Sequence, residues 1–221
     1  MNRDGAMTDR PVVYVADAGS VARGNFHWVS SLTLGESSQD PEALAHRIVR
    51  SLSRSKTVAL GFESPLFMPC PDERERLGKA RRGECSMETG NRPFNASAGA
   101  TVLVTGIQTL AWVLRKVQQA VPDTVGTTRW AEFQSKKADL LVWEAFVSGK
   151  EKAQDHVGDA RLAVEAFLHH WAKGDLESAS CVSGSHVFSL AGAAILFASL
   201  STDQSLLREP SIVLRPVATA R

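Results

Sequence analysis

Three short apolar runs, each ending in an acidic residue, limit the folds open to this chain. They are PVVYVADAGS with Asp17, KTVALGFESPLF with Glu63 and ADLLVWEAFVSG with Glu144. Continuous runs rich in β-branched residues are typical of strands that are buried on both faces of a sheet. Because helical patterns separate the runs, we expect an α/β protein with a largely parallel central sheet.

Helical signals fill the intervals between these strands. Residues 40–55 begin with Asp40 as a helix cap and Pro41 in the first turn. Residues 95–122 are predicted to form a long helix that stops at a proline. Directly after the first strand, RGNFHWVSSLTLG is predicted to pair with it as a hairpin, as one strand or two. The sequence therefore predicts a mixed sheet, with an antiparallel hairpin and parallel strands, flanked by helices.

The segment EKAQDHVGDARLAVEAFLHHW, residues 151–171, predicts a helix whose buried face begins with charged residues. Its apolar side chains recur at helical spacing. Continued backward by one turn, the same face carries Asp159 and His156, with Asp155 beside them. Asp155 is explained as a helix cap. Asp159 lies inside the helix, and a buried carboxylate there requires a hydrogen bond, a charged partner or a metal.

The acids at the strand ends and at the helix entrance are expected to meet. Carboxyl ends of neighbouring parallel strands lie at one edge of a sheet, where ligand sites form. Taken singly, an acid at a strand end is more often a turn residue or a helix cap than a ligand. Together, they would repel one another unless a cation neutralised them. Oxygen ligands suit Mg²⁺ or Mn²⁺, and an imidazole is better tolerated by Mn²⁺.

Five short motifs resemble a known group of proteins. They are YVADAGS, ALGFESPL, RPFNASAGA, VWEAFVSG and HVGDARLAVEAF, which span roughly residues 12–172. The chain resembles an uncharacterised family of predicted nucleases with a ribonuclease H-like fold, distantly similar to the RuvC-type Holliday-junction resolvases. The resemblance implies metal-dependent hydrolysis of phosphodiester bonds in nucleic acid.

The resemblance also assigns roles to residues. It implies that Asp17, Glu63 and Asp159 are the catalytic, metal-binding acids. His156 falls where resolvases of this type carry an acid or a histidine, and Glu144 matches an acid common in the uncharacterised family. The implied metal ligands are therefore Asp17, Glu63, Glu144, His156 and Asp159.

A basic stretch, ERERLGKARR, follows the second strand within a long loop at about residues 69–95. We consider two interpretations, a solvated surface helix and a surface that holds a nucleic-acid backbone through its phosphates. In the second interpretation, the nucleic-acid-binding residues are Arg74, Arg76, Lys79, Arg81 and Arg82.

Other function classes remain open. A ribonuclease H-like module that binds a small molecule or a protein without catalysis would keep only some of these acids. DAGS also resembles the first phosphate loop of actin-like ATPases and sugar kinases. However, 221 residues are too few for the two domains of an actin-like phosphotransferase.

Composition indicates a globular domain and a reducing compartment. The formal net charge of +1 predicts no global attraction to nucleic acid or membranes. The three cysteines lack zinc-site spacing, the first ten residues lack a signal-peptide core and no apolar run could span a bilayer, so we expect a cytoplasmic protein. We divide the chain into a flexible N-terminus (1–10), the ribonuclease H-like domain (11–175) and a C-terminal helical extension and tail (176–221).

Overall fold

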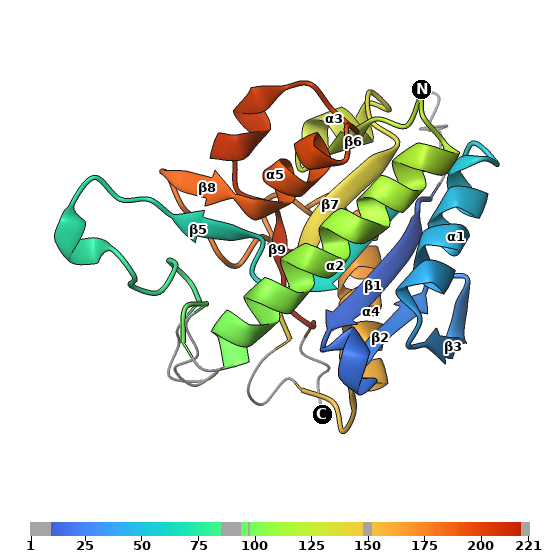
Figure 1. The fold of residues 1–221 in the computed structure, drawn as a ribbon, viewed down its shortest axis with the longest axis horizontal. Coiled ribbons are helices and arrows are strands. Elements are labelled where there is room, and N and C mark those ends of the chain that lie inside the picture. Colours follow the sequence, from blue (N-terminus) through green and yellow to red (C-terminus); the bar gives the residue numbers. More distant parts are fainter. Residues whose placement is uncertain (1–9, 85–93, 97, 148–151, 218–221) are drawn as a thin grey trace, which may run out of the picture.

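The computed structural model describes residues 10–84, 94–96, 98–147 and 152–217, which are arranged around a seven-stranded mixed sheet (Figure 1). The strands follow the order β3–β2–β1–β4–β7–β6, and β9 pairs with the end of β7. Their bounds are β1 Val12–Ala18, β2 Phe26–Ser30, β3 Thr33–Ser38, β4 Val58–Glu63, β6 Gly126–Thr127, β7 Leu140–Ala145 and β9 Val213–Leu214. The first three strands are antiparallel, whereas β4 and β7 run parallel to β1. The expected α/β class and mixed sheet are confirmed.

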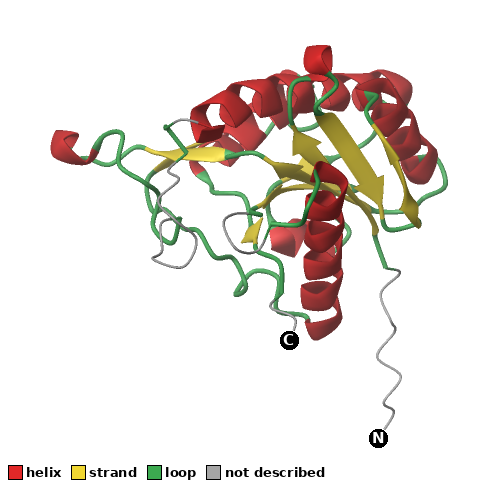
Figure 2. Ribbon diagram, turned by 90° about the horizontal axis from the view of Figure 1, so that it is seen from below, coloured by secondary structure: helices red, strands yellow, loops and turns green. Residues whose placement is uncertain are grey.

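Helices cover both faces of the sheet (Figure 2). They are α1 Pro41–Leu52, α2 Ala98–Ala120, α3 Trp130–Gln134, α4 His156–Lys173 and α5 Leu190–Phe197, with short 3-10 turns at Val21–Arg23, Arg74–Arg76 and Gln204–Arg208. The predicted cap of α1 is present, because the side chain of Asp40 accepts a hydrogen bond from the Glu42 amide. The long helix predicted over residues 95–122 is α2. None of the helices in the described segments is long and apolar enough to cross a membrane.

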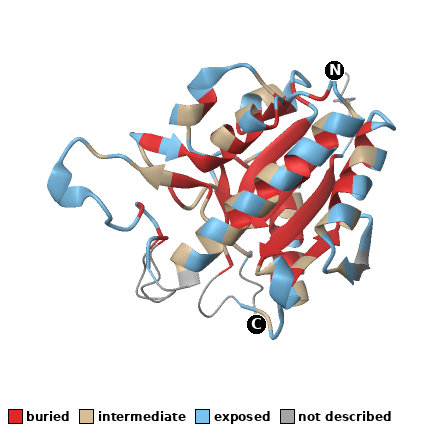
Figure 3. Cartoon of the chain, viewed as in Figure 1, coloured by how far each residue is buried: buried red, intermediate tan, exposed pale blue. Residues whose placement is uncertain are grey.

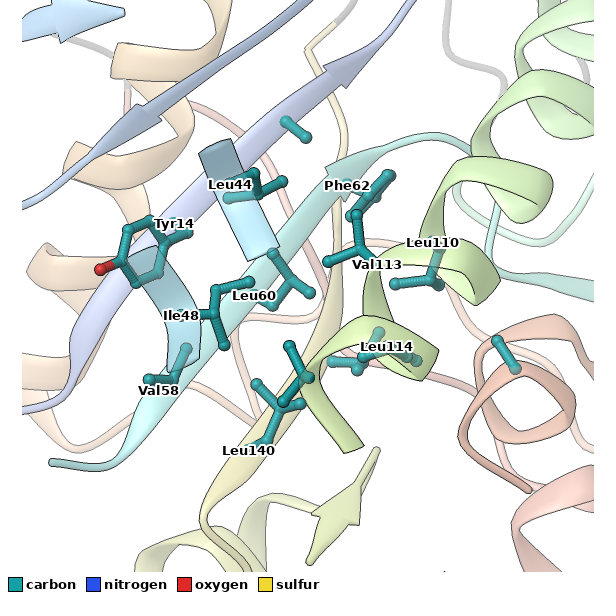
Figure 4. Close-up of a cluster of buried hydrophobic side chains, with 14 of the residues drawn as sticks. Tyr14, Leu44, Ile48, Val58, Leu60, Phe62, Leu110, Val113, Leu114 and Leu140 are labelled. Atoms are coloured by element: carbon teal, nitrogen blue, oxygen red, sulfur yellow. The ribbon is translucent and has the colours of Figure 1, made fainter. Parts of the chain in front are cut away.

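Alternation along each strand divides the interior into two cores. In β1, Tyr14 and Ala16 belong to the core under α1, α2 and α5. The same core contains Leu44, Ile48 and Leu114 (Figure 4). Val13 and Val15 belong to the opposite core, under α3 and α4. Successive side chains of a strand point to opposite faces, so the position of each residue in a strand decides which core it joins.

Helix α4 is held against the sheet by apolar side chains at helical spacing. Ala160, Ala163, Val164 and Phe167 are all buried in the α3–α4 core. Complete burial of a side chain such as Val164 or Phe167 stabilises a fold by about 1.5–3 kcal/mol. This packing fixes the first turn of α4, and the polar groups on it, above the carboxyl ends of the strands.

Residues 70–84 leave the body of the molecule as an extended segment, here called the basic excursion. They follow β5 (Phe67–Pro69), which pairs with β8 (Val187–Ser189) in a separate two-stranded sheet. Most of the basic excursion is exposed, in contrast to the buried central strands (Figure 3). The rest of the predicted loop, residues 85–93, lies outside the described residues.

The C-terminal segment, expected to be a helical extension and a tail, combines helix and strands. It contains α5, but also β8 and β9, and β9 extends the main sheet beside β7. Helix α5 packs in the same core as α2. The described part of residues 176–221 therefore completes the central body. The hairpin segment after β1 forms two strands, β2 and β3.

Candidate metal centre

Two acids face each other at the carboxyl edge of the sheet. Asp17 and Glu63 are register partners on the parallel strands β1 and β4. Both lie at odd-numbered strand positions, like Val13, Val15 and Ala59, which pack in the α3–α4 core. The alternation therefore directs both carboxylates to the face that α4 covers.

The third acid comes from the first turn of α4. Asp155 caps this helix through a hydrogen bond of 2.6 Å from the Gly158 amide, as the sequence predicted. Asp159 lies one turn further and is 3 % exposed. One ligand oxygen from each of Asp17, Glu63 and Asp159 can be chosen so that all three lie within 4.8 Å of one another. These three residues are called the carboxylate triad below.

The triad carries an electrostatic cost that shows in its pKa values. Burial raises the pKa of Asp17, although the positive charges of His156 and Lys152 oppose the shift. Burial and the negative charge of Asp17 raise the pKa of Glu63 well above its usual value. Such shifts indicate carboxylates that lack sufficient positive charge around them.

Lys152 supplies part of that charge. Its Nζ lies 3.2 Å from Asp159 Oδ2 and 3.5 Å from Glu63 Oε1. The amide of the next residue, Ala153, donates to the other Asp159 oxygen at 2.6 Å. Burial alone would lower the pKa of Lys152, but attraction by Glu63 and Asp159 outweighs it and the pKa is raised. The residue therefore stays an ammonium ion.

His156 lies at the edge of the triad. Its Nδ1 is 2.5 Å from Asp17 Oδ2, and its side chain is 53 % exposed. The imidazole also stacks on His27, with 5.7 Å between ring centroids and 12° between ring planes. His27 is the register partner of Asp17 on β2. Here His156 acts as a hydrogen-bonding partner of a triad acid, and the group of converging ligand atoms does not include it.

The structure places Glu144 away from the triad, which corrects its expected role as a metal ligand. Glu144 is the register partner of Phe62, and Phe62 packs in the core under α2. Strand alternation therefore sends the Glu144 side chain to the opposite face of the sheet from Glu63. There both of its oxygens accept hydrogen bonds of 2.7 Å from Arg81, and Oε2 also accepts one from the Leu66 amide.

Arg81 is likewise corrected, because its side chain cannot reach a nucleic-acid backbone. The guanidinium is fully buried, donates to Glu84 as well as Glu144, and lies 4.7 Å from the centroid of the Phe67 ring. Burial would lower the pKa of Arg81, but Glu144 and Glu84 outweigh this effect and raise it. Arg81, Glu84 and Glu144 are called the Arg81 cluster below. It anchors the end of the basic excursion.

The remaining residues of the predicted nucleic-acid surface are exposed. They are Arg74, Arg76, Lys79 and Arg82. Arg74 pairs with Glu75, and Arg76 lies 3.7 Å from Glu73, both in exposed positions. Exposed pairs of this kind contribute little and exchange readily for other partners. These four side chains are available to a ligand with negative charge.

Helix α2 fixes the chain immediately after both strand acids. Thr105 donates a hydrogen bond of 2.8 Å to the carbonyl of Ala18, and Ser64 donates one of 3.1 Å to the carbonyl of Val102. A Cβ atom at Gly106 would lie 2.2 Å from Ser64 Oγ, so only glycine permits this approach. The positions of Asp17 and Glu63 are therefore set from both sides of the sheet.

A pocket opens beside the triad. It has a volume of about 120 Å³. Its lining includes the charged residues Glu63 and Lys152 and the apolar residues Phe94, Val102 and Phe146. Glu84 and Glu144 also line it. The pocket thus lies between the triad and the Arg81 cluster and gives a ligand access to Glu63.

The donor set of the triad fits a hard divalent cation. Glu63 Oε2 is buried and accepts no hydrogen bond from the described residues, although a buried carboxylate oxygen ordinarily has a partner. Three carboxylates of this kind suit Mg²⁺ or Mn²⁺, which prefer oxygen ligands and retain water. The carboxylate triad could hold such an ion.

Lys152, His27 and Glu84 are polar residues of these sites that the sequence did not indicate. Lys152 lies at the start of the segment 151–171, before the cap Asp155, where apolar residues show no helical periodicity. His27 could have been found only from the register of β1 and β2. Glu84 stands three residues after Arg81 in a run of mixed charge, where exposed ion pairs would be the ordinary expectation.

Comparisons with models of protein families, with curated proteins and with solved structures each found no match to this chain.

Proposed function

We propose that this chain is a divalent-metal-dependent phosphodiesterase with a ribonuclease H-like fold, acting on nucleic acid. The observation that carries the proposal is the convergence of Asp17, Glu63 and Asp159 within 4.8 Å in a largely buried site. The sheet supports it, because an antiparallel hairpin leads into parallel strands, as the sequence predicted. The position of the acids at the carboxyl edge of the sheet is also where α/β proteins bind ligands.

Each triad residue would hold the cation from a different element. Asp17 and Glu63 are fixed by β1 and β4, and Asp159 by the packing of α4. A bound Mg²⁺ or Mn²⁺ would supply activation of water and neutralisation of charge on the phosphate. The buried surroundings strengthen electrostatic interactions with a phosphate that enters the site, because little water screens them.

The nucleic-acid part of the proposal is supported by the basic excursion. Arg74, Arg76, Lys79 and Arg82 are exposed on a segment that the Arg81 cluster anchors beside the pocket next to Glu63. Basic side chains of this kind hold phosphates without reading sequence. They would position a strand whose backbone passes the triad.

The test combines binding and cleavage. Branched, single-stranded and hybrid substrates are incubated with the protein and Mg²⁺ or Mn²⁺, and the products are resolved on denaturing gels. We expect cleavage by the wild type and none by the Asp17→Asn/Asp159→Asn double variant, which should still bind the same substrates. If the wild type has no affinity for DNA or RNA at low salt, where electrostatic binding is strongest, the proposal fails.

A second candidate is a binding module without catalysis. The observation in its favour is the position of the Lys152 ammonium, which contacts both Glu63 and Asp159. In a site that binds no metal, such an ammonium would neutralise part of the negative charge of the acids. Nucleic-acid affinity without cleavage in any metal would favour this candidate.

A further inference from the structure

Lys152 contacts two of the three acids that a metal ion held by the triad would use. Its ammonium contacts Asp159 Oδ2 at 3.2 Å and Glu63 Oε1 at 3.5 Å. The other Asp159 oxygen is already taken by the Ala153 amide at 2.6 Å. Lys152 thus contacts the Asp159 oxygen that accepts no bond from the Ala153 amide.

We propose that Lys152 is a tethered cation that holds the carboxylate triad in the metal-free protein and competes directly with a divalent ion for it. This inference rests on the proposed function and adds a regulatory feature to the same site. Metal binding would have to displace the ammonium from Asp159 and Glu63. The affinity for metal is therefore lower than three buried carboxylates alone would give.

The competition follows from charge and from contact geometry. An ammonium ion and a divalent cation repel each other, so both cannot sit against the same two oxygens at low cost. Lys152 is able to leave, because its side chain is 37 % exposed and lines the pocket beside Glu63. A flexible four-carbon stem carries the charge, so that displacement needs no movement of α4.

Without metal, the same contact stabilises the fold. Burial raises the pKa of Glu63 and Asp17, and the charge of Lys152 opposes both shifts. Removal of Lys152 would leave the hydrogen bond between His156 and Asp17 as a remaining described side-chain contact of the triad. Neutral variants at position 152 should therefore make the metal-free protein less stable. The same variants should bind the metal more tightly than the wild type does.

The experiment measures both states in the full chain. Mn²⁺ binding is titrated by calorimetry, and the melting temperature is recorded in the presence of a chelator, for the wild type, Lys152→Met and Lys152→Arg. Lys137→Met is the matched control, because it removes the same charge just before β7, at the amino edge of the sheet. Lys152→Gln provides a second neutral variant, should Lys152→Met not fold.

We expect Lys152→Met to bind Mn²⁺ roughly tenfold more tightly, as loss of a partly buried ion pair would allow. Its metal-free melting temperature should fall below that of Lys137→Met, while Lys152→Arg should stay close to the wild type in both measurements. Mn²⁺ binding by Lys152→Met but not by the wild type would also support the inference.

Two results would overturn the inference, and they are distinguishable. If the wild type binds Mn²⁺ and the neutral variants bind it no more tightly, Lys152 is not a competitor, and the proposed metal site stands. If neither the wild type nor any variant binds Mn²⁺ at millimolar concentration, the proposed metal function fails as well.

Discussion

The molecule contains two buried groups of acids and bases that differ in how well their charges are satisfied. In the Arg81 cluster, one guanidinium lies between two carboxylates, and every carboxylate oxygen accepts at least one hydrogen bond. In the carboxylate triad, three acids share Lys152 and His156, and Glu63 Oε2 has no partner among the described residues. The two groups face opposite sides of the same sheet.

The difference separates a structural role from a functional one. A satisfied ion cluster fixes one arrangement of the chain, and here it ties the basic excursion to β7 and to Leu66. An unsatisfied cluster of like charges costs stability in the absence of a ligand, and such a cost is usual where a site awaits a cation. We therefore expect substitutions in the two groups to change stability in opposite directions.

The largest effect is expected from Arg81→Met. It leaves Glu84 and Glu144 as buried carboxylates without their cation, and removal of one partner from a buried ion pair costs about 3–5 kcal/mol. The free energy of unfolding, measured by urea denaturation, should fall by that amount. Arg82→Met, one residue away but exposed, should change it by less than about 0.5 kcal/mol. If both substitutions lowered the free energy of unfolding equally, Arg81 would not be a structural anchor distinct from the exposed Arg82.

The second prediction concerns metal binding by the triad. Mn²⁺ at about one hundred times its dissociation constant should stabilise the native state by about 2.7 kcal/mol. Asp17→Asn should abolish most of this gain, because it removes one of three charged ligands. It should not destabilise the metal-free protein as Arg81→Met does, since it relieves repulsion with Glu63. The melting temperature with and without Mn²⁺ tests both statements, and a curve that Mn²⁺ leaves unchanged at millimolar concentration would argue strongly against a metal site.

The third prediction concerns the pH dependence of stability, and the expected change in the free energy of unfolding is smaller. Burial raises the pKa of Asp17 and Glu63 in the native state, so that between the usual and the raised pKa the native state binds more protons than the unfolded state. Their contribution to stability is therefore most favourable at low pH and decreases as the pH rises through the raised values.

The comparison of wild type with Asp17→Asn/Glu63→Gln isolates this contribution from that of other carboxylates. In a chelator, the double variant should gain stability relative to the wild type as the pH rises from about 4.5 toward neutrality. With Mn²⁺ present the trend should reverse, because protons compete with the metal and metal binding strengthens as the acids ionise. The same trend in both conditions would contradict metal binding by these acids.

The sequence predicts much of the fold because the strong signals are local. The apolar runs of β1, β4 and β7, the cap of α1 and the apolar face of α4 are each readable within a few residues. Asp17, Glu63 and Asp159 follow from them, since they stand at the ends of these elements.

The predictions for Glu144 and Arg81 were wrong because the positions of these side chains depend on strand register and on tertiary contacts. Glu144 lies near the end of its strand, as Glu63 does, but it pairs with Phe62 and not with Glu63. This shift of one residue places its side chain on the other face of the sheet, and the sequence alone does not fix the register. Arg81 has the same local surroundings as Arg82, yet the chain returns to the sheet at this residue and buries it. Lys152 contacts the triad because the segment before α4 packs against Asp159, to which the Ala153 amide donates a hydrogen bond.

The last prediction concerns the exposed arginines of the basic excursion, and their substitution should have little effect on stability. Arg76→Glu/Arg82→Glu alters two exposed residues, so the free energy of unfolding should change by less than about 1 kcal/mol. Nucleic-acid affinity should nevertheless fall, and the slope of its logarithm against that of the salt concentration should drop by about two, about one for each lost phosphate contact. Stabilisation by Mn²⁺ should be unaffected, because neither side chain belongs to the triad. Fluorescence anisotropy with labelled DNA and RNA across a salt series measures the slope. An unchanged slope would mean that the exposed charges of this segment do not hold the backbone, and that the Arg81 cluster anchors it for a different partner.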